Sequence, residues 1–95
     1  MNPAKVVRSR VTRLTDLPNI GPSIAEDLRL LGYSTPQQLA GQDPYEMYDR
    51  INRMTRKVHD PCLLDCFISV TRFMDGEKPQ PWWHYTKGRK ARLVR

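Results

Sequence analysis

A short turn with residues suited to anion binding precedes a predicted helix. Asn19 and Gly21 are residue types that tolerate positive φ, and the apolar Ile20 between them is expected to point inward as a plug. Such a turn leaves backbone N–H groups at a helix N-terminus, where the donors and the helix dipole point in the same direction. The segment from Ile20 to Ser23 therefore predicts a site for a phosphate oxygen. Binding through backbone donors is independent of base sequence.

Three basic side chains form a second candidate site. Arg53, Arg56 and Lys57 lie at the end of an expected amphipathic helix and in the turn after it. They are expected to form the basic patch of the central part of the chain, where they can contact a neighbouring phosphate. The alternative, that these side chains form a solvated face without a binding role, stays open.

The net charge of +6 is concentrated at the two ends. Residues 1–13 hold four basic residues and residues 87–95 hold five, and neither segment contains an acid. The central part holds the other seven Lys and Arg and all ten Asp and Glu, so it is net negative. We expect residues 1–10 and 87–95 to be disordered basic tails around one domain at 11–86. Two roles are open for these tails: they attract a polyanion, or they only keep the protein soluble.

A separate set of histidine and cysteine residues is of the types that bind metals or take part in catalysis. His59, Cys62 and Cys66 have spacings of three and four, but zinc knuckles and His pairs are missing, and the cysteines lie in an apolar helix. We therefore expect no metal, no cofactor and no catalytic residue. A lysine-based DNA lyase reaction through Lys57 or Lys78 is a lesser alternative to a non-enzymatic function.

The aromatic residues near the C-terminal end have two interpretations. Trp82, Trp83 and Tyr85 follow the most apolar helix. Exposed aromatic rings can stack on unpaired bases, whereas rings that fold back can seal a small core. The second interpretation is favoured.

Helix-start signals predict an all-α fold. Gly21, Thr35, Asp43 and Asp60 are favourable cap residues that each precede a proline. With one helix ahead of them, they predict a single domain of five helices, at 11–17, 22–31, 36–40, 44–58 and 61–75. The last is apolar on almost all sides and should be central. No apolar run approaches the roughly 20 residues of a membrane span, and no signal peptide is recognisable, so we expect a bacterial cytoplasmic protein with reduced thiols.

The segment from Leu17 to Tyr33 resembles a helix-hairpin-helix motif, with Asn19 in place of the usual first glycine. From Leu14 to Trp83 the chain resembles the bacterial pathogenicity-locus family, sometimes labelled mitomycin-resistance proteins. The residues that carry this resemblance are Leu17-Pro18-Asn19-Ile20-Gly21, Asp60-Pro61-Cys62-Leu63-Leu64 and Trp82-Trp83. It implies a helical fold similar to sterile-alpha-motif (SAM) domains, and a DNA-binding role linked to DNA repair or damage resistance.

These observations predict sequence-independent binding to the DNA phosphate backbone. The candidate residues are Asn19, Ile20, Gly21, Ser23, Arg53, Arg56 and Lys57. Glu26 and Asp27 follow the turn, and carboxylates there compete with phosphate for the positive helix end. A protein-interaction module that uses the hairpin and this acidic helix is therefore the alternative. The sequence does not assign an oligomeric state.

Overall fold

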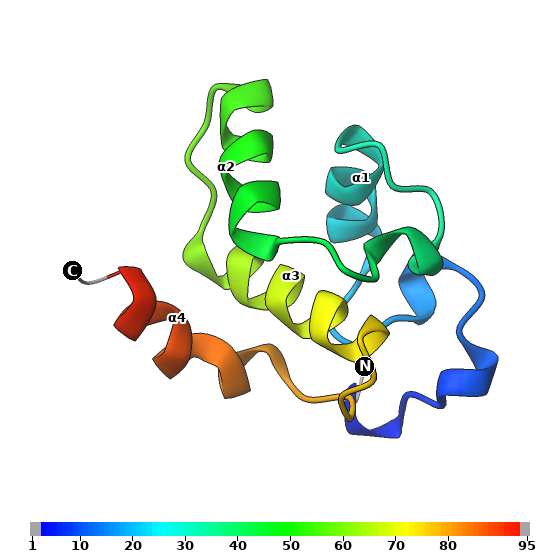
Figure 1. Ribbon diagram of the computed structural model, residues 1–95. Coiled ribbons are helices and arrows are strands. Elements are labelled where there is room, and N and C mark those ends of the chain that lie inside the picture. The colour runs from blue at the N-terminus through cyan, green and yellow to red at the C-terminus, as the bar shows by residue number, and fades with distance from the viewer. Residues whose placement is uncertain (1–2, 94–95) are drawn as a thin grey trace.

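The computed structural model describes residues 3–93, and this part of the chain is helical without strands (Figure 1). The four α-helices are α1 (Pro22–Leu30), α2 (Pro44–Thr55), α3 (Pro61–Met74) and α4 (Thr86–Leu93). Short 3-10 turns occupy Pro3–Lys5, Arg8–Arg10, Leu14–Asp16, Pro36–Leu39 and Trp82–Tyr85. The radius of gyration, 12.4 Å, is close to the value of about 12 Å for one compact domain of this length.

The core is built around α3, as its apolar sequence predicted. Ten of its 14 residues are buried, so neighbours cover it on several faces. Leu28 of α1 and Ile51 of α2 are fully buried in the same cluster as Phe67 of α3. None of the helices in residues 3–93 combines the length and apolar character needed to cross a membrane.

Two of the five expected helices are single 3-10 turns, so the predicted helix count was wrong. At Leu14–Asp16, the Asp16 carboxylate accepts hydrogen bonds from the backbone N–H groups of Thr12 and Arg13. These bonds lower the pKa of Asp16 to about 2. Leu17 precedes a proline and is extended, which stops further helix growth. At Pro36–Leu39, the Gln38 side chain similarly accepts from two preceding backbone N–H groups.

The expected disordered tail from residue 87 was also wrong, because residues through Leu93 belong to α4. The physical reason is Asp65, a fully buried carboxylate in the middle of α3. It accepts hydrogen bonds from Nε and Nη2 of Arg89 at 2.9 and 3.1 Å, and from Oγ1 of Thr86 at 2.7 Å. A buried charge needs such a partner, and α4 supplies it.

The N-terminal arm differs from the expected disordered segment in the same way. The Arg8 guanidinium lies 4.0 Å from the ring centroid of Phe73 and donates hydrogen bonds to the carbonyl oxygens of Phe73 and Glu77. The arm is therefore packed at the C-terminal end of α3. The remaining residues of the two expected tails, 1–2 and 94–95, lie outside the described residues.

Candidate nucleic-acid interface

The turn between the Leu14–Asp16 segment and α1 has much of the predicted conformation. Asn19 has φ of 69°, in the left-handed region, and Ile20 is fully buried, which confirms its predicted inward orientation. Gly21 is a residue type that tolerates positive φ, but it does not use this freedom here. Its φ of −91° and ψ of −177° are extended, because it acts as the N-cap of α1. The left-handed step of the turn is therefore made by Asn19 alone.

The Asn19 side chain connects three parts of the fold. Its Nδ2 donates to Oγ of Ser69 at 3.0 Å and to the carbonyl oxygen of Gln80 at 2.8 Å. Its Oδ1 accepts from the backbone N–H of Trp82 at 3.1 Å. The turn is thus tied to α3 and to the segment before α4. Asn19 was predicted to contact DNA, but its amide is already engaged, so its contribution is to position the turn.

The N-terminus of α1 has backbone donors for which the described part of the chain supplies no acceptor. Pro22 occupies the first helical position, and Gly21 provides no side-chain cap. Among the described residues, no acceptor pairs with the backbone N–H groups of Gly21, Ser23 and Ile24.

The next two helices differ at this point. Asp43 caps α2 by accepting from the backbone N–H groups of Tyr45 and Glu46, and Asp60 caps α3 by accepting from that of Cys62. Carboxylates of the chain thus occupy the N-termini of α2 and α3. Within residues 3–93, no carboxylate takes the equivalent position at the N-terminus of α1.

An exposed tryptophan lies beside these donors. A pocket of about 260 Å³ is lined by Pro3, Asn19, Gly21, Trp82 and Trp83. Trp82 is partly buried against the core, whereas Trp83 is 62% exposed and meets Trp82 edge to face at 5.5 Å between ring centroids. The favoured sealing role thus applies to Trp82, and the stacking role suits Trp83. Trp83 was not assigned to the predicted site, although the aromatic cluster was the signal for it.

A larger, mostly apolar groove of about 460 Å³ also adjoins the turn and shares Asn19 and Trp82 with the smaller pocket. Asn19, Ile24 and Asp27 contribute from the hairpin side, and Lys57 and His59 from the connection between α2 and α3. The structure therefore brings one member of the predicted basic patch, Lys57, to the hairpin.

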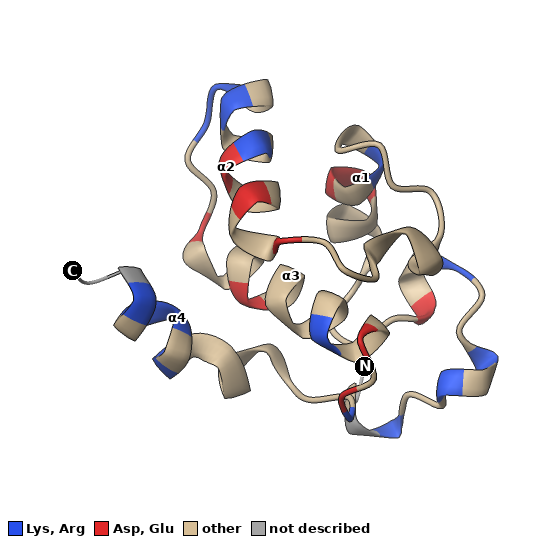
Figure 2. Ribbon diagram, viewed as in Figure 1, with Lys and Arg blue, Asp and Glu red and all other residues tan. Residues whose placement is uncertain are grey.

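The other two members of the basic patch lie at the end of α2. Arg53 and Arg56 are exposed there, and Arg56 caps the helix in the left-handed conformation. Figure 2 shows the basic residues at the C-terminal end of α2 and in the segment that follows it.

The carboxylates after the turn are placed where their competition with phosphate is weak. The first turn of α1 contains no acidic residue. Glu26 forms an ion pair with Arg29 one turn further along, and Asp27 is half-buried at the groove. Because the effect of the helix dipole falls off within the first turn, neither carboxylate occupies the position of an N-terminal anion.

The cysteine and histidine side chains do not form a reactive pair. The Nδ1 of His59 is 2.7 Å from Oδ1 of Asn52, within hydrogen-bonding distance. A hydrogen bond with Asp60 raises the pKa of Cys62, and burial raises the pKa of Cys66 to about 12. Protonated thiols are poor nucleophiles at neutral pH. Across residues 3–93, no group of three or more His, Cys, Asp or Glu side chains is arranged to hold a metal ion.

Comparison with known proteins gives one family and one close relative. Residues 7–91 match the family model Cdd1, described as pathogenicity locus. The chain is also similar to the mitomycin resistance protein McrB of Streptomyces lavendulae, with 40% identity over 81 residues. That alignment covers 85% of this chain and 77% of the relative. No solved structure matches the chain.

Proposed function

The chain belongs to the pathogenicity-locus family, and from this we propose that it is a non-enzymatic protein that binds DNA without sequence preference. Its relative is named a mitomycin resistance protein, which supports a role in DNA-damage resistance. In this proposal, the turn before α1 is the hairpin of a helix-hairpin-helix motif. The first helix of that motif is reduced to the Leu14–Asp16 turn, and the whole domain is of the SAM-like class.

The observation that carries the proposal is the set of backbone N–H groups at Gly21, Ser23 and Ile24, for which residues 3–93 supply no acceptor. A phosphate oxygen at this position accepts hydrogen bonds from the donors and lies at the positive end of the helix dipole. Trp83 lies beside the same turn and is free to contact a sugar or an unpaired base. Lys57 adds a cation at the adjacent groove. None of these contacts depends on base sequence.

Substituting the N-cap of α1 tests the proposal. Gly21→Asp places a carboxylate where it caps the free N–H groups and repels phosphate. We expect the affinity for duplex DNA to fall by about 10- to 100-fold, which corresponds to the loss of hydrogen bonds to a charged group. Stability should be kept, because Gly21 has extended φ and a Cβ at this position meets no atom within 4 Å. Fluorescence anisotropy with a labelled duplex at fixed salt measures the change.

Gly21→Ser is the matched control, because serine caps the same N–H groups without a charge. We expect its affinity to lie between those of the wild type and Gly21→Asp. Unchanged DNA affinity in Gly21→Asp contradicts binding at this turn.

The basic patch gives an independent prediction. Reversal of all three charges, Arg53→Glu with Arg56→Glu and Lys57→Glu, is expected to weaken DNA binding and to flatten its salt dependence. The slope of log K against log salt should decrease by about 0.9 for each phosphate contact that is lost. A titration series over salt concentration measures both quantities.

A control for net charge reverses three exposed basic residues elsewhere, Lys5, Arg10 and Lys78. If both triple variants change the slope equally, the effect comes from overall charge, and the patch has no specific role.

A protein-interaction module is the second candidate, because the groove beside the hairpin is mostly apolar. Ile24, Leu63 and Trp82 line it, and the nearby Val58 is 83% exposed. Apolar side chains of a partner fit such a groove better than phosphate does. Salt separates the two functions. Counterion release makes DNA affinity fall steeply as salt rises, whereas binding through apolar contacts is retained.

A further inference from the structure

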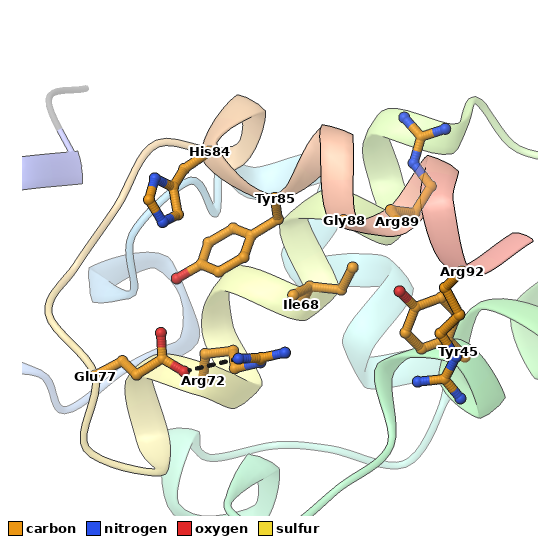
Figure 3. Close-up of a pocket in the computed structure, with 9 residues that line it drawn as sticks. All are labelled: Tyr45, Ile68, Arg72, Glu77, His84, Tyr85, Gly88, Arg89 and Arg92. Atoms are coloured by element: carbon orange, nitrogen blue, oxygen red, sulfur yellow. Dashed lines mark hydrogen bonds and ion pairs between the residues drawn. The ribbon is translucent and has the colours of Figure 1, made fainter.

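A third cavity lies on the other side of α3 from the groove beside the hairpin. Figure 3 shows this pocket, which has a volume of about 330 Å³. Ile68 and Arg72 of α3, His84 and Tyr85 of the 3-10 turn, and Gly88 and Arg92 of α4 line it. Its volume is at the lower end of the range for small-molecule sites in proteins. Neither the family description nor the relative's name assigns a function to it.

Tyr85 lines this pocket, and its hydroxyl is buried beside the cavity without a hydrogen bond to the described residues. Tyr85 is 9% exposed and packs in a cluster with Leu64 and Ile68. Its hydroxyl has no partner among the described residues, although buried hydroxyl groups are almost always hydrogen bonded. Burial raises the pKa of Tyr85, so the hydroxyl stays protonated and can act as a donor. In Figure 3 the ring extends toward the Arg72–Glu77 pair.

The charges around the pocket favour an anion. Arg72 donates to Oε2 of Glu77 at 3.1 Å, and this half-exposed contact leaves other guanidinium N–H groups free to donate. Arg92 stacks over the ring of Tyr45, 3.7 Å from the ring centroid. In this stacked position, the N–H groups at the edge of the guanidinium can still donate to a ligand. Arg89 is neutralised by Asp65 and adds no net charge. Two cations thus face one carboxylate.

We propose that this pocket is a binding site for a small phosphate monoester. The phosphate accepts hydrogen bonds from the Tyr85 hydroxyl and the Arg72 guanidinium. The body of the ligand extends past Ile68 and Gly88 toward the pair of Arg92 and Tyr45 at the other end. Guanidinium groups suit phosphate because their planar N–H groups bond two of its oxygens at once.

Gly88 has no side chain to fill the pocket. It lies within α4 and lines the cavity, and a Cβ there meets no atom within 4 Å. A glycine inside a helix is less favourable than alanine. Gly88→Leu is therefore expected to retain the fold while its side chain narrows the pocket.

The test uses Tyr85→Phe and a titration with adenosine monophosphate at constant ionic strength, followed by backbone amide shifts. For the wild type, we expect shifts at residues 72, 85 and 88. Tyr85→Phe removes an unpaired buried hydroxyl, so the free protein should be as stable as the wild type or more stable. Its affinity for the nucleotide should fall by roughly tenfold. Tyr33→Phe, at a tyrosine that bonds to Gln42 instead, is the matched control and should bind normally.

Two further variants keep the test decisive if Tyr85→Phe folds poorly. Arg72→Gln changes an exposed side chain, and Gly88→Leu narrows the cavity; both should weaken nucleotide binding. Gly21→Asp should leave it unchanged, so this site and the hairpin site can fail separately. The absence of binding by adenosine monophosphate at millimolar concentration overturns the proposal, as does equal binding by wild type and Tyr85→Phe.

A final arm of the experiment identifies the source of the phosphate. If short duplex DNA displaces the nucleotide from these residues, the site takes a phosphodiester of the DNA backbone, and the proposal of a site for a small monoester is overturned. If the duplex leaves the shifts unchanged and inorganic phosphate or adenosine monophosphate produces them, the site takes a free phosphate compound.

Discussion

Arg89→Ala is expected to lower the free energy of unfolding by about 3–5 kcal/mol and to release α4 from α3. The Asp65 side chain is completely buried and that of Arg89 is 9% exposed, so the pair is shielded from water. Removing the guanidinium leaves Asp65 with Thr86 as its remaining side-chain partner. The loss is large because a domain of this size has a total stability of about 5–15 kcal/mol.

Urea denaturation monitored by circular dichroism measures the change in the free energy of unfolding. Lys90→Ala is the matched control, because it removes an exposed positive charge from the same helix. If the two variants are equally stable, the ion pair does not hold α4 in place. Asp65→Leu combined with Arg89→Met should recover much of the loss, since an apolar pair of similar volume replaces a buried ion pair at little cost.

Asn19→Ala is expected to cost about 2.5–6.5 kcal/mol of stability, because it affects both the backbone and the side chain of the hairpin turn. Alanine in the left-handed region costs roughly 1–2 kcal/mol. The three hydrogen bonds to Ser69, Gln80 and Trp82 are lost as well, each worth about 0.5–1.5 kcal/mol. The segment carrying Trp83 should then move away from the turn, so DNA affinity should also fall.

Asn19→Gly separates these two contributions. Glycine adopts the φ of 69° without strain but lacks the amide, so this variant should lose about 1–2 kcal/mol less than Asn19→Ala. Chemical denaturation of both variants provides the comparison. Wild-type stability in Asn19→Gly contradicts a stabilising role for the side-chain hydrogen bonds.

Features of the fold that depend on nearby residues were predictable from the sequence. The prolines after Gly21, Asp43 and Asp60 mark the starts of α1, α2 and α3, since proline at the first helical position is favourable there. The apolar surface of α3 also predicted its central position. The helix at 11–17 was predicted from apolar residues at a spacing of three, Val11, Leu14 and Leu17. This spacing was misleading, because a row of apolar residues does not distinguish one 3-10 turn from a short helix.

Features that depend on distant residues could not be predicted. Residues 86–93 are basic and contain a glycine, so in the sequence they resemble a solvated tail. Their helix depends on the buried carboxylate of Asp65, which lies 24 residues before Arg89. The hydrogen bonds of Asn19 connect residues 50 to 63 positions apart, so the sequence indicated the turn without its partners. The position of Lys57 beside the hairpin is also a result of tertiary packing.

The pairing of Asp65 with Arg89 has a consequence for the order in which the protein folds. Arg89 follows Asp65 by 24 residues and lies on another helix, so α3 has its cation only after α4 has docked. Until then, the carboxylate keeps its water of hydration and opposes burial of the apolar residues around it. Docking of α4 therefore controls when the interior closes, and a chain in which α4 has come loose exposes its most apolar segment.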